Sequence, residues 1–450
     1  MNRTERRLAA KNNKKRQKRV NPGNALSSAI SLHQKGQLAE AEKIYRSIVQ
    51  KQPDNPDALH FLGVLLHQTG QSDKAIANIK QALQINPAYL DACNNLGNIY
   101  KETGDMQQAA ETYRRVIDMA PDHAGACNNL GVVLRNLEAY EESERVLLKA
   151  AELSPDNADV FQNLGNTYQE QDECRKAAEA YRQAIVLRPN HKYAYESLWK
   201  MLLKTGQSEE AREVLHNWLA ADPGNPIARH HLSACLGEDV PDRASEAYIQ
   251  DIFDKFAASF DTVLNRLDYR APELVTQAVA ALFPEPRQDL RVLDAGCGTG
   301  LCGPLLRPYA GTLVGVDLSS GMLRKAKGRE IYDALVEADL VEYLGREKAA
   351  FDVIVSADTL VYFGDLAPLL KEAAGALKAA GSLVFTVEKS DEESGNGFRL
   401  NPHGRYAHAH DYIKASLAAS GFDLRAADTV VLRKEAGQPV VGLLVTAVLN

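Results

Sequence analysis

An apolar run ends in an acid that is followed by a glycine at every second position. Leu293 and Asp294 precede Gly296, Gly298 and Gly300. The apolar run predicts a buried strand. The glycines allow a sharp turn and leave bare backbone against which a ligand can lie. We therefore expect a nucleotide-type ligand at this loop.

Two more acids follow apolar runs further along the chain. Asp317 follows residues 312–316, and Asp339 follows residues 334–338. Strands and helices alternate from about residue 290, which predicts a mostly parallel, doubly wound sheet. Residues 424–432 and 440–449 are expected to form an antiparallel hairpin at its edge. Ligands of such sheets lie beyond the carboxyl ends of the strands, where these acids are expected.

The loop fits two kinds of ligand. Residues 298–303 satisfy the dinucleotide pattern G-x-G-x-x-G, but that pattern should begin directly after the strand. Here the strand is expected to end at Asp294. A pyrophosphate would be repelled by the carboxylate of Asp294, whereas a cationic sulfonium ligand would pair with it.

Residues 294–300, read as D-x-G-x-G-x-G, resemble motif I of class I S-adenosylmethionine-dependent methyltransferases, and the resemblance spans about residues 245–450. It implies that S-adenosylmethionine is the cofactor. It also implies that Asp317 holds the ribose hydroxyls and that Asp339 and Leu340 contact the adenine amine. Leu318 and Met322 would flank the adenine. The expected cofactor-binding residues are Asp294, Gly296, Gly298, Gly300, Asp317, Leu318, Met322, Asp339 and Leu340.

The methyl acceptor is less clearly indicated. Residues 351–362 lack the Asn/Asp-Pro-Pro-Tyr signature of many amide and base-amine methylases, which disfavours such acceptors. Residues 404–412, with 431–435 and 439–442, resemble a group of predicted methyltransferases fused to tetratricopeptide repeats. A base is needed only if the acceptor must lose a proton.

Three residues are candidates for the catalytic site. His408 is the candidate base because its ordinary pKa suits proton transfer, although a packing or capping role at a helix start is an alternative. Arg405 could bind an acceptor carboxylate through two hydrogen bonds. Tyr362, with Asp358, follows the expected strand 351–356 and should face the entering acceptor. No His/Cys spacing suggests a metal site.

The first half of the chain repeats every 34 residues. Positions that hold a small residue, positions that hold a large residue and the Leu-Gly pairs all recur with this period. The prolines do so too, at Pro53, Pro87, Pro121, Pro155, Pro189 and Pro223. The pattern resembles the tetratricopeptide repeat, a pair of antiparallel helices. We expect an all-α solenoid of six repeats and a capping helix over residues 22–236, followed by the α/β domain.

Asparagines recur on one expected helix face of the repeats. The resemblance implies that they bind an extended peptide, because tetratricopeptide proteins use asparagines at such positions, and an amide can both donate and accept. The alternative is that they are ordinary repeat residues without a ligand. The candidate peptide-binding residues are Asn95, Asn98, Asn129, Asn163 and Asn166.

Four segments are expected: a basic tail over residues 1–21, the solenoid over 22–236, a linker with lid helices over 237–288, and the methyltransferase domain over 289–450. The aromatic residues of 244–267 could belong to the core or to a lid. The first nineteen residues hold nine Lys or Arg and one acid, whereas the whole chain has a net charge of −7. We therefore do not expect nucleic acid as a partner of the folded body, whereas the tail could bind it or could be a disordered, solubilising arm.

No apolar run approaches the roughly 20 residues of a membrane helix. The six cysteines form no C-x-x-C pair, and we expect a cytoplasmic protein. The leading hypothesis is a methyltransferase whose repeats recruit a protein or peptide acceptor. The alternatives are a small-molecule methyltransferase whose repeats serve assembly, and a donor-binding scaffold without catalysis.

Overall fold

The structure is a computed structural model of the 450-residue chain, and it describes residues 22–237, 239–391, 396–435 and 437–450. The chain forms two compact units, one ending at Thr205 and the other beginning at Gly206. The predicted basic tail, residues 1–21, lies outside the described residues.

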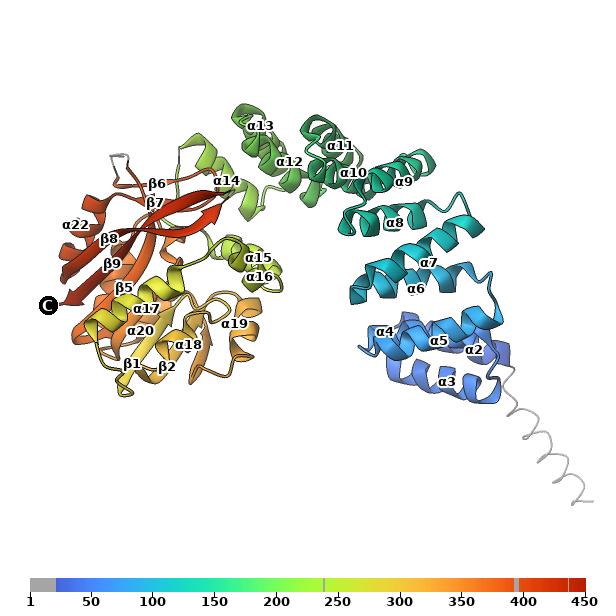
Figure 1. The fold of residues 1–450 in the computed structure, drawn as a ribbon, viewed down its shortest axis with the longest axis horizontal. Helices are drawn as coiled ribbons and strands as arrows, with labels where there is room; N and C mark the ends of the chain where they lie inside the picture. The colour runs from blue at the N-terminus through green and yellow to red at the C-terminus, as the bar shows by residue number, and fades with distance from the viewer. Residues whose placement is uncertain (1–21, 238, 392–395, 436) are drawn as a thin grey trace, which may run out of the picture. The chain divides into compact units, whose positions relative to one another are not determined.

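The described part of the first unit consists of antiparallel helix pairs that stack on one another (Figure 1). Each pair repeats the 34-residue period. The described helices of the first unit are α2 (Pro22–Gln34), α3 (Leu38–Lys51), α4 (Pro56–Gln68), α5 (Ser72–Ile85), α6 (Leu90–Thr103), α7 (Met106–Met119), α8 (Ala124–Asn136), α9 (Tyr140–Leu153), α10 (Ala158–Glu170), α11 (Cys174–Leu187) and α12 (Lys192–Lys204).

The glycine of each Leu-Gly pair lies against a large residue of the second helix in its own pair. A Cβ atom on Gly97 would lie 2.8 Å from the ring of Tyr113, and one on Gly63 would lie 2.5 Å from Ile79. Gly131 and Gly165 meet Leu147 and Tyr181 in the same way. The recurring glycine and the recurring large residue are therefore the two sides of one close contact between the helices of a pair.

The second unit begins with helices and continues into a sheet. The helices are α13 (Ser208–Ala221), α14 (Pro226–Leu236), α15 (Glu246–Phe256), α16 (Phe260–Arg266) and α17 (Ala271–Leu282). The strands are β1 (Leu290–Ala295), β2 (Ala310–Asp317), β3 (Ala334–Glu337), β4 (Phe351–Ser356), β5 (Leu377–Lys389), β6 (Phe398–Leu400), β7 (Tyr406–His408), β8 (Phe422–Glu435) and β9 (Gln438–Leu449).

The sheet order is β3-β2-β1-β4-β5-β7-β6, with β9 paired to β5 and β8 paired to β9. Strands β1 to β5 are parallel, and β8 and β9 form the predicted antiparallel hairpin. An all-α repeat array followed by a doubly wound α/β domain confirms the predicted fold class.

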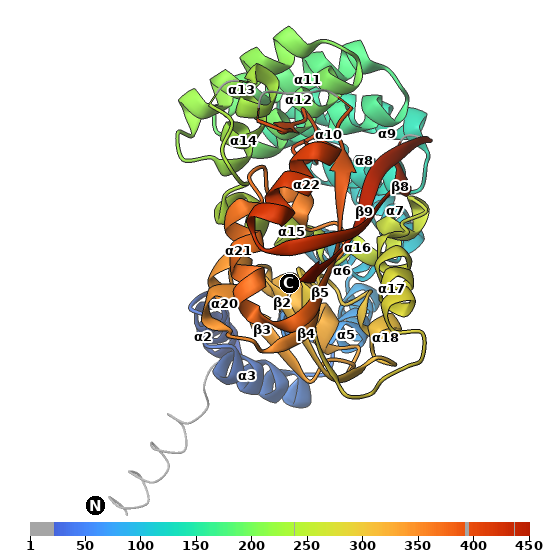
Figure 2. The same cartoon turned by 90° about the vertical axis from the view of Figure 1, so that its left-hand side faces the viewer.

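Both faces of the sheet are covered, as expected for parallel strands. One core contains residues of α20 (Leu340–Arg346), α21 (Ala367–Ala376) and α22 (His410–Ala419), and the other contains residues of α17 and α18 (Gly303–Leu306). Figure 2 shows these two sets of helices on opposite sides of the strands. Helix α19 (Ser320–Lys327) follows β2.

The structure adds elements that the sequence did not predict. Helix α20 lies between β3 and β4, and the short strands β6 and β7 extend the sheet beyond β5. The end of β5 pairs with β7 at Glu388 and Lys389. Strands of three residues have too little periodicity to be recognised in a sequence.

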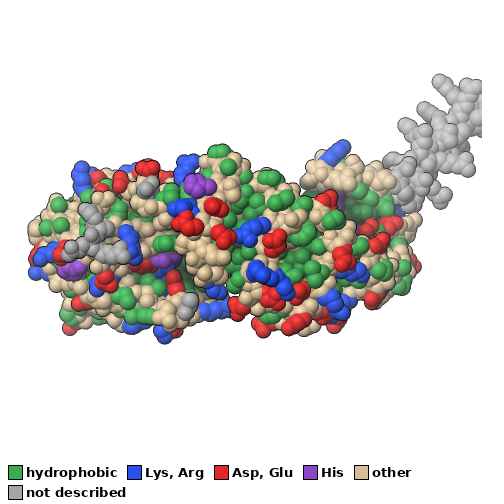
Figure 3. Space-filling view, turned by 90° about the horizontal axis from the view of Figure 1, so that it is seen from above, with side chains coloured by type: hydrophobic (Ala, Val, Ile, Leu, Met, Phe, Trp, Pro, Cys, Tyr) green, Lys and Arg blue, Asp and Glu red, His purple; other side chains and the backbone are tan. Residues whose placement is uncertain are grey.

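No helix among the described residues is long and apolar enough to cross a membrane. On the face seen in Figure 3, acidic and basic side chains are interspersed.

Candidate functional site

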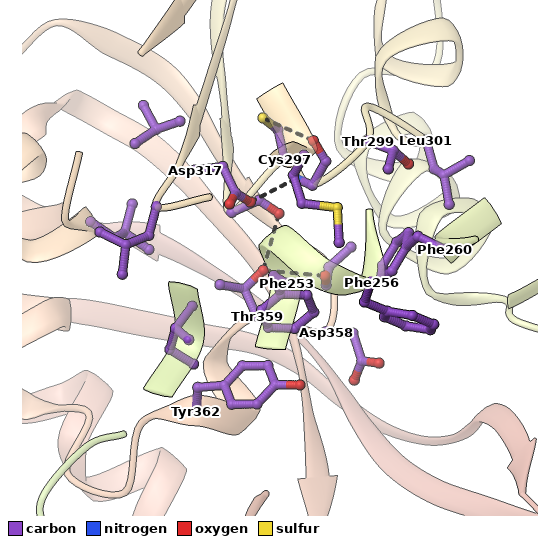
Figure 4. Close-up of a pocket in the computed structure, with 18 of the residues that line it drawn as sticks. Phe253, Phe256, Phe260, Cys297, Thr299, Leu301, Asp317, Asp358, Thr359 and Tyr362 are labelled. Carbon is purple, nitrogen blue, oxygen red and sulfur yellow. Dashed lines mark hydrogen bonds between the residues drawn. The ribbon is translucent and has the colours of Figure 1, made fainter. Parts of the chain in front are cut away.

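A cavity of about 350 Å³ lies at the carboxyl ends of the parallel strands in the second unit. Figure 4 shows that residues from the loop after β1, the end of β2 and the segment after β4 surround it. Helices α15 and α16 contribute aromatic side chains to the same wall. Its position agrees with the general rule for ligands of doubly wound sheets.

Asp317, the last residue of β2, lines the cavity. Its Oδ2 atom accepts a hydrogen bond of 2.8 Å from the backbone N–H of Gly298, and Oδ1 accepts one of 2.8 Å from Ser319. Burial raises the pKa of the Asp317 carboxyl, and these backbone donors oppose that rise. The side chain is thus held in one orientation, with lone pairs left for a ligand.

The glycine loop leaves its backbone open at one point only. A Cβ atom on Gly298 would meet nothing nearer than Phe260 at 3.9 Å, whereas one on Gly296 would overlap the side chain of Thr359. Gly300 lies beneath Tyr332 and does not line the cavity. Gly298 therefore offers bare backbone to a ligand, while Gly296 and Gly300 are required by packing.

Asp294 does not line the cavity, so its predicted pairing with a cationic ligand stays a prediction that the geometry does not support. Its side chain is buried, and its Oδ2 atom accepts a hydrogen bond of 2.6 Å from the hydroxyl of Tyr332. Burial raises the pKa of Asp294 to about 7. The hydrogen bond to Tyr332 ties this carboxyl to the segment after α19.

Asp339, which follows β3, lines the cavity and caps α20 by accepting a hydrogen bond from the backbone of Glu342. The guanidinium of Arg243 donates to its other oxygen at 2.7 Å. Leu318, Met322 and Leu340 also line the cavity. Seven of the nine expected cofactor-binding residues thus surround one space, and the exceptions are Asp294 and Gly300.

Two acids fix the helices that cover the cavity. Asp254 of α15 accepts hydrogen bonds from the Ser319 hydroxyl at 2.6 Å and from the Gly321 backbone at 2.9 Å. Asp261 of α16 accepts one from the Thr299 hydroxyl and pairs with Arg329. Helices α15 and α16 are therefore hydrogen-bonded to the segments that follow β2 and β1.

Four aromatic rings form an apolar wall of the cavity. Phe256 and Phe260 lie 5.2 Å apart in an edge-to-face arrangement, and Phe253 meets Tyr362 at 5.4 Å. Figure 4 shows Tyr362 and Asp358 away from Asp317. Of the two interpretations of residues 244–267, this geometry favours a cover over the cavity.

A cluster of charged side chains stands beside the aromatic wall. We call it the ionic cluster, and it consists of Asp358, Glu388, Arg405, Arg433 and Glu435. Arg433 is 3% exposed and bonds Asp358, Glu388 and Glu435 with its three nitrogens. Arg405 donates to Glu388 at 2.6 Å and to Glu435 at 2.7 Å. Four of its members line the cavity, all except Glu388.

His408 does not line the cavity, so the structure does not support it as the base. It lies on β7 and not at a helix start. It is fully buried, and its Nε2 atom donates to the carbonyl oxygen of Gly364 at 3.0 Å. Burial lowers the pKa of His408 to about 4. A buried, neutral histidine of this kind supports the sheet edge.

Arg405 does line the cavity, but its Nε and Nη2 atoms are already bonded to Glu388 and Glu435. The predicted recognition of an acceptor carboxylate by Arg405 stays a prediction. Tyr362 lines the cavity as expected. Burial raises the pKa of its hydroxyl to about 12, so it stays protonated at neutral pH.

Sequence reasoning missed Arg433 as a site residue. Strand β8 carries an irregularity between Val431 and Arg433, and both Leu432 and Arg433 are buried. A bulge of this kind re-aims side chains next to a site and breaks the strict alternation of a strand. In the sequence, residues 431–435 served only as part of a family resemblance, and β8 carries other charged residues, so no local pattern distinguished Arg433.

The asparagines of the repeat array are half-buried and bonded to one another or to neighbouring side chains. Asn129 donates to Asn98 at 3.2 Å, and Asn163 donates to Asn128 at 2.9 Å. Asn95 bonds His60, and Asn166 accepts from Tyr181. The first helices of successive repeats are thus linked by a ladder of amides.

Comparison with known families agrees with this geometry. Residues 293–385 match the family described as a methyltransferase domain. Tetratricopeptide repeat families match residues 32–77, 65–104, 94–158 and 163–226. The chain therefore carries tetratricopeptide repeats followed by a methyltransferase domain, which confirms both predicted resemblances.

Individual proteins match parts of the chain. A malonyl-(acyl-carrier protein) O-methyltransferase from Priestia megaterium is 33% identical over 162 residues, which are 35% of this chain and 55% of that protein. Methyltransferase-like protein 27 from Homo sapiens is 30% identical over 144 residues, covering 32% and 58%. The chain spans about half the length of these curated relatives. The crystal structure of MamA is 25% identical, covers 36% of this chain and 95% of that one, and has a TM-score of 0.35.

Proposed function

We propose that this protein is an S-adenosylmethionine-dependent methyltransferase. The observation that carries the proposal is the carboxylate of Asp317, fixed by two backbone donors at the end of β2 and facing the cavity. The match of residues 293–385 to a methyltransferase domain supports the same function.

The cavity residues fit this cofactor. Asp317 would hold the ribose hydroxyls, because a carboxylate has lone pairs beyond the two that the backbone uses. Leu318, Met322 and Leu340 would flank the adenine with apolar surface, and Asp339 would accept from its amine. The open backbone at Gly298 leaves room for the remainder of the ligand.

The bound cofactor supplies a methyl group that is already activated by the sulfonium. The chain itself must position the acceptor and exclude water. The rings of Phe253, Phe256 and Phe260 do so from helices α15 and α16. Asp254 and Asp261 hold those helices against the ligand loops.

Calorimetric titration with S-adenosylhomocysteine tests the cofactor assignment. Asp317→Ala should weaken binding by at least about tenfold, because hydrogen bonds to a charged group are lost. Asp289→Ala is the matched control, since Asp289 is exposed and pairs with Arg287 away from the cavity. Unchanged binding by a folded Asp317→Ala protein would refute the assignment.

We further propose that the repeat array recruits the methyl acceptor, a protein or peptide segment. Tetratricopeptide stacks commonly bind extended partners, and the asparagines of the ladder are only half-buried, so part of each residue is accessible. A remote binding surface would raise the local concentration of the acceptor.

Labelled cofactor in a cell lysate tests recruitment. Asn95→Ala combined with Asn129→Ala should weaken labelling of a protein band and leave S-adenosylhomocysteine binding unchanged. Asn78→Ala is the control, because Asn78 bonds only the backbone of its own helix. Label that appears only in small molecules would favour a small-molecule acceptor, and cofactor binding without any transfer would favour a scaffold.

We also propose a cytoplasmic location. All six cysteines are free thiols, which suits a reducing compartment.

A further inference from the structure

The segment that joins α14 to α15 lies along the wall of the cavity. Arg243, Ala244 and Glu246 line the cavity together with the residues proposed to bind the cofactor. Residues 293–385 are the part of the chain that matches a methyltransferase domain, so this segment contributes to the cavity from outside that part. We call residues 241–246 the linker strap.

The backbone of the linker strap is bonded to the segment that follows β4. The N–H of Ala244 donates to the carbonyl oxygen of Tyr362 at 2.8 Å, and the carbonyl oxygen of Asp242 accepts from the N–H of Gly364 at 2.8 Å. Between these bonds, Arg243 and Phe363 form an isolated antiparallel bridge. The linker strap is therefore held against the cavity as a short extra strand.

Both ends of the linker strap are anchored as well. The carbonyl oxygen of Pro241 accepts a hydrogen bond of 2.6 Å from the hydroxyl of Tyr406. Ser245 caps α15 by accepting one of 3.3 Å from the backbone N–H of Tyr248. Because the backbone is fixed on both sides of Arg243, the side chain of Arg243 starts from a defined position at the cavity wall.

Arg243 reaches the end of the cavity where Asp339 lies. Its Nη1 atom donates to Asp339 Oδ2 at 2.7 Å, and the other oxygen of Asp339 caps α20. Glu246 forms a longer ion pair with Arg243, at 3.7 Å. Among the described residues the side chain of Arg243 makes no further hydrogen bond, and it is 39% exposed. Most of the guanidinium is therefore available to a molecule in the cavity.

The chemistry of this end suits a planar ring that carries an amine. A guanidinium is planar and weakly hydrated, and it stacks on aromatic rings as well as binding carboxylates. Its charge-assisted hydrogen bond fixes the direction of the Asp339 carboxylate. Each oxygen of that carboxylate keeps a second lone pair for an N–H of the ligand. Leu318, Met322 and Leu340 add apolar surface at the same cavity.

We propose that the linker strap is part of the cofactor site, and that Arg243 recognises the purine ring by lying against it and by holding Asp339 toward its amine. This inference rests on the proposed methyltransferase function. It gives the segment between the repeats and the methyltransferase domain a role in ligand binding, in addition to joining them.

Calorimetric titration of the full chain with S-adenosylhomocysteine tests the role of Arg243. Arg243→Met should weaken binding by about tenfold, because the cation over the ring and the bond to Asp339 are both lost. Arg346→Met is the matched control, since Arg346 also pairs with an acid of α20, at 2.9 Å, and does not line the cavity. A folded Arg243→Met protein that binds as tightly as the unaltered chain would overturn the proposal.

S-inosylhomocysteine separates recognition of the ring from general support of the fold, because it carries a carbonyl oxygen in place of the adenine amine. The unaltered chain should prefer S-adenosylhomocysteine by at least about tenfold. Arg243→Met should reduce this preference by at least about threefold, whereas Arg243→Lys should keep it, since an ammonium can still donate to Asp339. Equal weakening of both ligands in Arg243→Met, with the preference unchanged, would contradict the proposal.

Hydrogen exchange of the unaltered chain tests the linker strap without any substitution, so the proposal stays testable if Arg243→Met does not fold. Saturating S-adenosylhomocysteine should slow exchange over residues 241–246. Residues 410–419 of α22 are the reference segment, because none of them lines the cavity. Exchange over 241–246 that changes no more than in the reference segment would refute a role for the linker strap in binding.

Failure of this inference differs from failure of the proposed function. If S-adenosylhomocysteine does not bind the unaltered chain, the methyltransferase assignment fails. If it binds but neither Arg243 nor the linker strap responds, only the part of the site proposed here is wrong.

Discussion

The Nε2 atom of His230 donates a hydrogen bond of 2.9 Å to the carbonyl oxygen of Gly404. His230 lies on α14, and the residue after Gly404 is Arg405, a member of the ionic cluster. The neighbouring His231 bonds the carbonyl of Pro402 at 3.1 Å. A helix in phase with the repeats therefore holds the loop that leads into the cavity.

His230→Ala should loosen this loop. It removes the donor to Gly404 and leaves a buried carbonyl without a partner, at a cost of roughly 1–3 kcal/mol. Hydrogen exchange should become faster over residues 401–408, and mass spectrometry of that segment measures it. The control is His216→Ala, because His216 is exposed on α13. Unaltered exchange in the His230 variant would show that the contact does not order the loop.

Two glycines of the ligand loop should respond differently to alanine. Both have positive φ, 78° at Gly296 and 54° at Gly298, which costs about 1–2 kcal/mol for a residue with a Cβ atom. Only Gly296 also faces Thr359, whose Cβ would lie 2.6 Å from the new atom. Gly296→Ala should therefore lose roughly 1–3 kcal/mol more stability than Gly298→Ala, because of the added overlap.

Urea unfolding followed by circular dichroism measures both variants, with a separate fit for each unfolding transition. Equal losses in the two variants would mean that Thr359 moves aside at little cost.

Two glycines of helix α8 provide a similar comparison in the repeats. Alanine is the better helix former by about 1 kcal/mol, so an exposed glycine should tolerate or benefit from the change. Gly125→Ala should be neutral or stabilising, since the new Cβ meets only His123 at 3.4 Å. Gly131→Ala should be destabilising by roughly 1–3 kcal/mol, because its Cβ would overlap Leu147. Thermal melting of the two proteins compares them directly, and a Gly131→Ala protein as stable as Gly125→Ala would disprove the contact.

Acid should destabilise the chain in part through His408. Its pKa is lowered to about 4 in the folded state, against an ordinary value of 6.5. Between these values the unfolded chain binds a proton that the folded chain does not, so stability falls as the pH falls from 6.5 to 4. The full effect is roughly 3 kcal/mol.

His408→Gln keeps an N–H for the Gly364 carbonyl and removes the titration. Urea midpoints at pH 7 and pH 5 should therefore differ less in this variant than in the unaltered chain. An identical difference in both proteins would assign the acid sensitivity to other groups. Burial also lowers the pKa of His230 and His60, so the comparison between the two proteins is the meaningful quantity.

Periodicity predicted the helix pairs correctly because the 34-residue repeat arises from a contact within each pair. Gly97 and Tyr113 belong to one helix pair, and their spacing recurs wherever that pair recurs. Asp317 and Asp339 lie at the cavity for a similar reason, since the carboxyl ends of parallel strands meet at the ligand edge of the sheet.

Other site residues depended on contacts between distant segments. Asp294 directly follows its strand pattern as well, yet Tyr332 covers it and removes it from the cavity. His408 and Arg405 are three positions apart, but the pairing of β7 with the end of β5 buries one and leaves the other at the cavity.

The sequence by itself determined the repeat array, the α/β domain and the acids at the strand ends, because each depends on periodicity or on a position directly after a strand. Only the tertiary structure decided the ionic cluster. Arg433 reaches Asp358 across 75 residues of chain, from a strand whose bulge turns it inward. Which way a side chain points at a bulge depends on the partner strand, and no local pattern specifies that partner.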